Sequence, residues 1–297
     1  RVAEEDKVNL YSLFSNIYLN PANAFIGINA SGKTSVLKVL LLALGIINNE
    51  PINHMNTKDI LGNTKNAILN VYFYSETTKE ICRLETVITS KNTKVEGVVY
   101  SIESESLWSK KAEEVTTRKA MLDFEEREPV IVRDEQESFL SDDVSIMIAY
   151  NKKTGEHIKV VSMLLFTNVN VLPFSEGIPA EVISYLDPTI EKLNFEEKNE
   201  KPIIHLKFKG KEEIVLNNPI ELNNYLSSGT VKGMITFTLA QEVLKDGGYL
   251  IVDEIENHFN KEIVTTLVRF FMDSRFNKNG GILIFTTHYP ELLDEYD

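Results

Sequence analysis

The chain has 297 residues, of which 43% are hydrophobic and 25% are charged, and its formal net charge is −13. This length and apolar content predict a soluble globular protein with one large domain or two smaller ones. The acidic balance argues against a protein that coats nucleic acid non-specifically, because phosphate contacts need clustered Lys and Arg. Contact with nucleic acid through a local basic patch stays open.

The sequence also argues against a membrane or secreted protein. Its longest apolar run, residues 36–47, is interrupted by Lys38, and the N-terminus shows no signal-peptide pattern. The single cysteine, Cys82, excludes an intramolecular disulfide and fits a reducing compartment. We therefore expect a cytoplasmic protein without a membrane partner. Because the chain begins at Arg1 rather than Met, we also expect it to be a trimmed form of a longer protein.

The first block of the chain predicts a phosphate-binding loop between a strand and a helix. The strand is expected at residues 24–26 and the buried helix at residues 34–46. Between them GINASGKT, residues 27–34, matches G-x-x-x-x-G-K-[ST] in full. In such a loop glycines let backbone N–H groups face a phosphate, and the helix N-terminus adds partial positive charge. The candidate nucleotide-binding residues are Gly27, Asn29, Ala30, Ser31, Gly32, Lys33 and Thr34.

The middle of the chain has a different pattern. Three β-branched and aromatic runs separated by polar turns predict an antiparallel meander, at residues 67–74, 80–89 and 95–102. A charged helix is expected next, at residues 105–128. From residue 130 to 220 we expect a mixture of short elements: strands at 145–150, 158–165 and 203–208, and a helix at 179–193.

The last block alternates strands and helices again. We expect a helix at 231–244 that stops at Asp246-Gly247-Gly248, then a strand at 249–252, a helix at 261–271 and a strand at 281–285. Together with the first block, this alternation predicts an α/β fold in which helices cover a mostly parallel sheet.

Chemically useful side chains follow two of these strands. Asp253 and Glu254 come directly after residues 249–252, where Asp253 would hold Mg²⁺ together with Thr34, and Glu254 would orient or deprotonate the attacking water. Lys33 would bridge the β- and γ-phosphates of ATP. His288 follows the last strand and can hydrogen-bond a γ-phosphate. The alternative for Asp253 and Glu254 is a solvated acidic loop, and the alternative for His288 is a histidine with a structural role.

Four segments taken together resemble the ABC-type ATPases. They are GINASGKT at 27–34, LSSGT at 226–230, YLIVDEIENHFN at 249–260 and LIFTTHYPELLD at 283–294. The last two resemble the branch that holds SMC, RecF and OLD proteins, especially the small ATPases of bacterial abortive-infection and anti-phage systems. LSSGT departs from the LSGGQ-like pattern of the family.

The resemblance implies a homodimer that holds two ATP molecules head to tail. Ser227, Ser228 and Gly229 would bind the γ-phosphate held by the other protomer, and residues 257–260 would lie at the seam. Glu254, Lys33 and His288 would be the catalytic residues, with His288 as the switch histidine. A metal-sensing glutamine would have to be Gln136, although its charged neighbourhood does not resemble the end of a buried strand.

The resemblance also implies one composite ATPase domain. Its parts would be an N-terminal lobe (1–66), the β meander (67–104), a helical or mixed insertion (105–220) and a C-terminal lobe (221–297). The implied function is Mg²⁺-dependent ATP hydrolysis that gates an effector protein, such as a nuclease or toxin subunit, in anti-phage defence or DNA maintenance. Three alternatives stay open: a DNA-repair ATPase acting directly on DNA, the ATP-binding subunit of a transporter, and an ATP-binding scaffold with little turnover.

Overall fold

A computed structural model describes residues 6–62, 65–95, 97–133, 140–166, 178–198, 201–257 and 259–292. The chain has a mixed α/β fold with one parallel sheet and several antiparallel ones. The chain divides into two compact units. Unit 1 combines Arg1–Tyr11, Asn20–Lys33 and Lys159–Asp297, and unit 2 combines Ser12–Leu19 and Thr34–Ile158.

A parallel four-stranded sheet forms the centre of unit 1. Its strands lie in the order β3 (Ala22–Ile26), β13 (Ile282–Thr287), β12 (Tyr249–Val252) and β8 (Val160–Ser162). Parallel neighbours need a crossover connection, and helix α6 (Lys261–Met272) supplies the one between β12 and β13. The predicted parallel sheet in the two strand-and-helix blocks is therefore confirmed.

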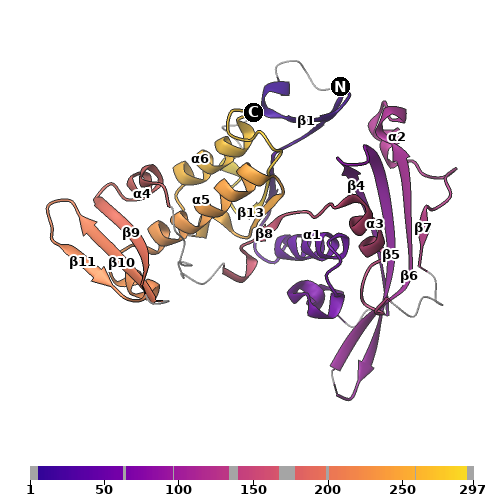
Figure 1. The fold of residues 1–297 in the computed structure, drawn as a ribbon, viewed down its shortest axis with the longest axis horizontal. Coiled ribbons are helices and arrows are strands. Elements are labelled where there is room, and N and C mark those ends of the chain that lie inside the picture. The colour runs from indigo at the N-terminus through magenta and orange to yellow at the C-terminus, as the bar shows by residue number, and fades with distance from the viewer. Residues whose placement is uncertain are drawn as a thin grey trace. The chain divides into compact units, whose positions relative to one another are not determined.

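Helices α5 (Ser228–Asp246) and α6 pack against this sheet and form one core with it (Figure 1). Met234 and Val243 of α5 and Phe271 of α6 are fully buried there. Helix α5 ends as predicted, because Gly247 takes a positive φ and its N–H bonds to the carbonyl of Val243. Burial of these apolar side chains holds the helices on the sheet.

A small antiparallel sheet completes unit 1. It has the order β11 (Glu213–Leu216), β10 (Lys201–Phe208) and β9 (Ile190–Lys198), and it confirms the strand predicted at 203–208. The helix predicted at 179–193 is too long, because α4 covers only Ala180–Leu186. Asp187, the residue before Pro188, is extended, as a following proline favours. The unit also contains short 3-10 helices, η1 (Asp6–Asn9), η5 (Leu164–Phe166), η6 (Pro219–Asn224), η7 (Ile255–Asn257) and η8 (Pro290–Leu292).

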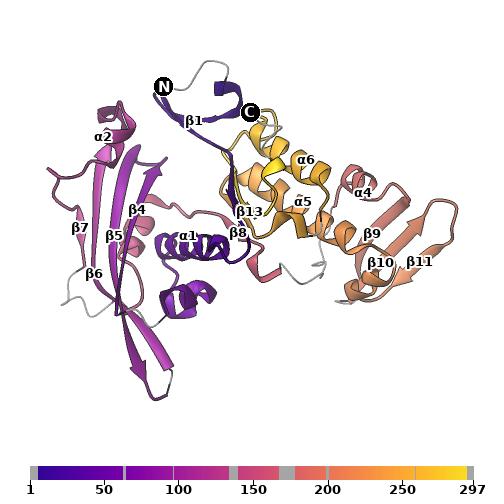
Figure 2. The same cartoon turned by 180° about the vertical axis from the view of Figure 1, so that it is seen from behind.

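An antiparallel sheet organises unit 2 and confirms the predicted meander. Its order is β4 (Asn66–Ser75), β5 (Glu80–Thr93), β6 (Gly97–Lys111) and β7 (Ile131–Val132). Helices α1 (Lys33–Ile47) and α3 (Met147–Thr154) share a core with one face of this sheet (Figure 2). Other elements of the chain are the paired strands β1 (Tyr11–Phe14) and β2 (Ile17–Leu19), helix α2 (Arg118–Leu122), and the 3-10 helices η2 (Ile52–His54), η3 (Asn56–Leu61) and η4 (Ala112–Glu114).

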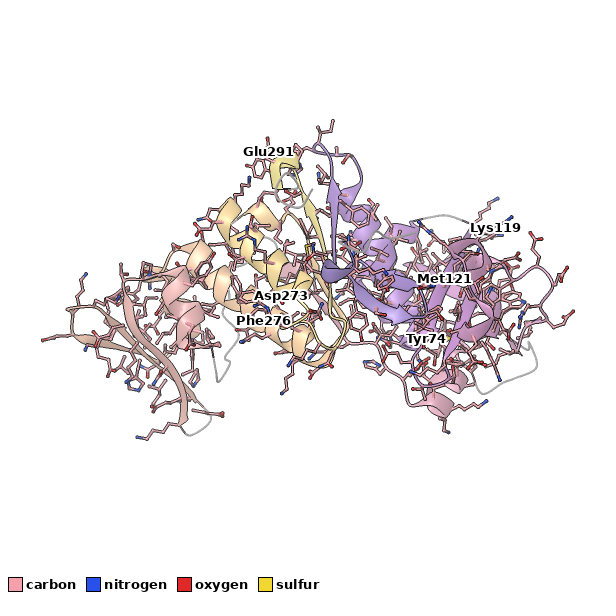
Figure 3. The ribbon with its side chains drawn as sticks, turned by 90° about the horizontal axis from the view of Figure 1, so that it is seen from above. Tyr74, Lys119, Met121, Asp273, Phe276 and Glu291 are labelled. Carbon is pink, nitrogen blue, oxygen red and sulfur yellow. The ribbon has the colours of Figure 1, made fainter. Side chains whose placement is uncertain are left out.

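The helix predicted at residues 105–128 is wrong. The first seven of these residues belong to β6, which pairs with β5 along its length. Within residues 105–128, all of which the structure describes, only α2 is an α-helix. Glu105, which was predicted to begin the charged helix, is opposite Thr86 in this pairing and is buried. Met121 of α2 and Tyr74 of β4, labelled in Figure 3, pack into a small cluster beside this sheet.

The strand predicted at residues 145–150 is also wrong, because α3 begins at Met147. The buried carboxylate of Glu105 accepts hydrogen bonds from the Ser145 hydroxyl (2.9 Å) and the Ile146 N–H (2.7 Å), just before the helix starts. Periodicity alone does not separate a short buried helix from a buried strand. In the part of the chain that the structure describes, no helix is long and apolar enough to cross a membrane.

Candidate functional site

The register of the parallel sheet in unit 1 brings three of the predicted segments to the edge where its strands end. Ile26 of β3 pairs with Thr287 of β13, so Gly27 follows beside His288. Val252 of β12 pairs with Phe285, so Asp253 and Glu254 follow beside the last two residues of β13. Because carboxyl ends of parallel strands lie at the same edge, the loop, the acids and the histidine meet there.

The loop that begins at Gly27 is exposed and contains Lys33 at its end. Residues 28–32 are exposed, and Ala30 and Gly32 both take a positive φ. Such successive turns create concave sets of backbone N–H groups, and the start of a helix leaves its first N–H groups without intrahelical partners. Both features suit the binding of an anion.

Lys33 folds back onto its own loop. Its Nζ donates to the carbonyl oxygens of Gly27 (2.7 Å) and Ile28 (3.1 Å), and it lies 3.1 Å from His288 Nδ1. A phosphate that binds here competes with these neutral acceptors for the ammonium group. Charge-assisted bonds are the stronger ones, so an anion has the advantage.

His288 connects the loop with the acids. Its Nδ1 lies within hydrogen-bond distance of both Lys33 Nζ and the Gly27 carbonyl (2.9 Å). Nδ1 can bond only one of them at a time, because it accepts from Lys33 when it carries no proton and donates to the carbonyl when it carries one. Its Nε2 lies 3.6 Å from Glu254 Oε1. Its backbone N–H donates to Glu256 Oε1 (2.7 Å). This bond fixes the backbone position from which the imidazole side chain extends.

Asp253 and Glu254 are joined through one hydroxyl. Thr286 Oγ1 donates to Asp253 Oδ1 (2.6 Å) and accepts the backbone N–H of Glu254 (2.7 Å). Asp253 and Thr286 are buried, whereas the side chain of Glu254 is 36% exposed. The two acids therefore have separate environments although they are neighbours in the chain.

The backbone of Glu254 is strained. Its φ is +47°, in the left-handed region that non-glycine residues rarely occupy. Asn257 Nδ2 donates to Glu254 Oε2 (2.6 Å), and the Asn257 N–H bonds to the Glu254 carbonyl (2.9 Å), so the turn is held from both sides. Such strain persists where surrounding contacts over-determine it, and it is frequent at functional sites.

The predicted signature residues stand at the start of helix α5. Ser227 caps α5: its Oγ accepts the Thr230 N–H (3.0 Å) and pairs with the Thr230 hydroxyl (2.8 Å). Ser227 and Ser228 are exposed, and Gly229 is half-buried. Among the described residues, the side-chain hydrogen bonds of Ser227 stay within this first turn.

The sequence also assigned Thr34, Gln136 and residues 257–260 to the site. Thr34 follows Lys33 in α1 and is the first residue of the second segment of unit 2. Gln136 and His258 lie outside the described residues. Of the segment predicted to lie at the dimer seam, Asn257 contacts Glu254 and Asn260 caps α6 by accepting the Ile263 N–H (2.9 Å).

The sequence interpretation missed three residues of the site. Thr286 and Glu256 contribute the bonds described above, and their only signal was proximity to His288 and Glu254 in the chain. The third is Lys232 of α5, which is 5% exposed. Burial lowers the pKa of Lys232, and the negative charge of Glu254 opposes this shift. Glu254 therefore interacts electrostatically with the helix that begins at the signature.

The donor set of this edge fits a phosphate ligand better than a metal held by protein alone. No group of three or more His, Cys, Asp and Glu side chains able to hold a metal occurs in the described parts of the chain. A single carboxylate, Asp253, oriented by a hydroxyl, is what Mg²⁺ uses when phosphates supply other ligands. Comparison with known protein-family models gave no match, and comparison with curated proteins gave none either.

Proposed function

We propose that this chain binds ATP at residues 27–34 and hydrolyses it with Mg²⁺. The observation that carries the proposal is the cluster of a lysine, a histidine and a glutamate at the end of three parallel strands. Lys33 Nζ lies 3.1 Å from His288 Nδ1, and His288 Nε2 lies 3.6 Å from Glu254 Oε1. Positive charge for phosphates and a carboxylate for water are the parts that phosphoryl transfer to water needs.

The residues divide the work as follows. Lys33 leaves its carbonyl partners and neutralises charge on the phosphates. Glu254 orients a water molecule and takes its proton as the oxygen attacks the γ-phosphorus and the bond to ADP breaks. His288 hydrogen-bonds the γ-phosphate. Asp253 would hold Mg²⁺, which would supply further neutralisation of the phosphate charge.

The proposal extends to a head-to-tail homodimer. It rests on the resemblance of LSSGT to the ABC signature, and the exposure of Ser227 and Ser228 at the N-terminus of α5 supports it. The end of a helix attracts an anion such as the γ-phosphate of a nucleotide held by another copy. We further propose that the ATP cycle gates an effector, a nuclease or toxin subunit, in anti-phage defence or DNA maintenance.

A second candidate is an ATP-dependent switch with little turnover. One contact favours it: Asn257 Nδ2 donates to Glu254 Oε2 at 2.6 Å and so occupies one oxygen of the carboxylate that would take the proton. In this alternative, ATP binding and dimerisation alone would signal to the effector.

The experiment that tests the proposal measures phosphate release by the purified chain with Mg²⁺·ATP, with and without EDTA. ATP binding is measured by equilibrium titration of a fluorescent ATP analogue, and dimerisation by light scattering. Turnover that EDTA abolishes supports the ATPase, whereas binding and dimerisation without turnover support the switch. A chain that binds no ATP refutes both. Stimulation of turnover by DNA, falling steeply with salt, would identify an ATPase acting on DNA.

A further inference from the structure

The side-chain hydroxyl of Thr286 bonds both candidate acids. Thr286 is the fifth residue of β13 and is 0% exposed. A backbone N–H can only donate, so the Thr286 hydroxyl accepts from Glu254 (2.7 Å) and its single proton goes to Asp253 Oδ1 (2.6 Å). One hydroxyl therefore fixes the carboxylate of one acid and the backbone of the other.

The bond to Glu254 acts on a strained backbone. Glu254 has a φ of +47°, which carries its side chain away from the buried position of Asp253 and toward His288 and Asn257. Without an acceptor for its N–H, this turn loses the bond that offsets the strain.

The neighbouring threonine shows that this arrangement is specific. Thr287 is equally buried, but its hydroxyl accepts the N–H of Tyr289 (3.1 Å), two residues further along its own chain. Register explains the difference, because β12 ends at Val252 opposite Phe285, and Asp253 therefore continues beside Thr286. The pairing of the two strands, rather than the presence of threonine, creates the contact.

We propose that Thr286 is a positioning residue that couples the Mg²⁺-binding carboxylate of Asp253 to the water-orienting carboxylate of Glu254. This inference rests on the proposed ATPase function. A hydroxyl bonded to a metal-binding carboxylate keeps that carboxylate in its binding orientation. Through the same oxygen, movement of Asp253 on metal binding reaches the backbone of Glu254, so the metal and the water are aligned together.

The test compares three variants of the full chain. Thr286→Val removes the hydroxyl at constant shape, and Thr286→Ser keeps it. The matched control is Thr236→Val in α5, since Thr236 is also 0% exposed and its hydroxyl bonds the carbonyl of Lys232 (2.8 Å) within its own helix. Turnover, KM for ATP, the Mg²⁺ concentration for half-maximal turnover and Tm are measured for each, together with binding of the fluorescent ATP analogue with and without Mg²⁺.

We expect Thr286→Val to lower kcat at least about tenfold and to raise the Mg²⁺ requirement several-fold. Nucleotide affinity without Mg²⁺ should stay within about threefold of the wild type, while the gain in affinity that Mg²⁺ gives should shrink. Thr286→Ser should restore both properties to within about threefold. If valine prevents folding, Thr286→Ala serves as the second variant.

Two results would overturn the inference, and they differ in what else they refute. If the wild type hydrolyses ATP and Thr286→Val matches Thr236→Val in kcat, Mg²⁺ requirement and nucleotide binding, Thr286 has only a structural role and the ATPase proposal stands. If the wild type neither binds nor hydrolyses ATP, the ATPase proposal fails and the inference fails with it.

Discussion

Lys33 Nζ lies 3.1 Å from His288 Nδ1, although the two residues are 255 positions apart in the chain. The same ammonium group donates to the carbonyl oxygens of Gly27 and Ile28. The lysine is therefore held in place before any anion arrives, and binding of phosphate must exchange these partners.

Replacing Lys33 tests this exchange. Lys33→Met should weaken ATP binding roughly tenfold to a hundredfold, because it removes charge-assisted bonds to the phosphates. Titration of a fluorescent ATP analogue measures the change. Lys38→Met is the control, since Lys38 lies on α1 in a partly exposed ion pair with Asp59. Equal affinities in the two variants would remove Lys33 from the site.

Glu254 is expected to act on the chemical step. Glu254→Gln keeps the shape of the side chain but cannot take a proton from water, so kcat should fall on the order of 10²-fold or more while ATP binding is kept. The ATP-bound dimer should then accumulate and be visible by light scattering. Glu262→Gln is the control, because Glu262 is an exposed carboxylate in the first turn of α6. Wild-type turnover in Glu254→Gln would contradict the assignment.

Replacing Ser227 distinguishes two roles of this residue, a helix cap and a residue that binds the nucleotide of a second molecule. Ser227→Arg should leave ATP binding at its own loop intact but abolish ATP-driven dimerisation and hydrolysis. Thr117→Arg is the matched control, because Thr117 caps α2 through the N–H of Ala120 (3.1 Å) in the other unit. Losing a cap alone costs about 1 kcal/mol of stability.

A mixing experiment makes the same test without relying on one variant. Lys33→Met and Ser227→Arg proteins are each expected to be inactive. A mixed head-to-tail dimer contains one composite site with an intact loop from the serine variant and an intact signature from the lysine variant. Turnover should therefore reappear on mixing. If the mixture stays inactive while both proteins fold, the signature does not act in the partner.

Glu105 predicts a pH dependence of stability. Burial raises the pKa of this carboxyl above its ordinary value of 4.5, against bonds from Thr86, Ser145 and Ile146 that lower it. The folded state then binds a proton more tightly than the unfolded state, so this group stabilises the fold fully below about pH 4.5 and less as pH rises through its raised pKa.

The comparison with Glu105→Gln isolates this effect. The amide cannot accept the Ile146 N–H with its nitrogen, so the variant should be less stable by about 1–3 kcal/mol in acid. Urea unfolding between pH 4 and pH 8 should show this difference shrinking as pH rises, because only the wild-type group titrates. A difference that grows with pH would have the wrong sign and would reject the explanation.

Two failures of sequence interpretation, at residues 105–128 and 145–150, have one cause. ESLWSKK, residues 105–111, was expected to lie on a charged helix, yet Glu105 and Lys110 are buried on β6, where Lys110 donates to the carbonyls of Ala120 and Asp123. Charge marks a residue as exposed only when no buried partner is available, and these partners come from other elements. The strand expected at 145–150 became α3 because the carboxylate of Glu105, from β6, holds the residues just before it.

The sequence by itself determined the local elements at the site: a strand before Gly27, a helix after it, a strand that ends at Val252 before two acids, and the Gly247 stop of α5. These depend on the residues' own φ preferences and on apolar periodicity, which are local. Only the tertiary structure decided that Asp253 continues beside Thr286 and that Lys33 reaches His288. Those contacts depend on the order and register of parallel strands far apart in the chain, which burial across the whole sheet selects.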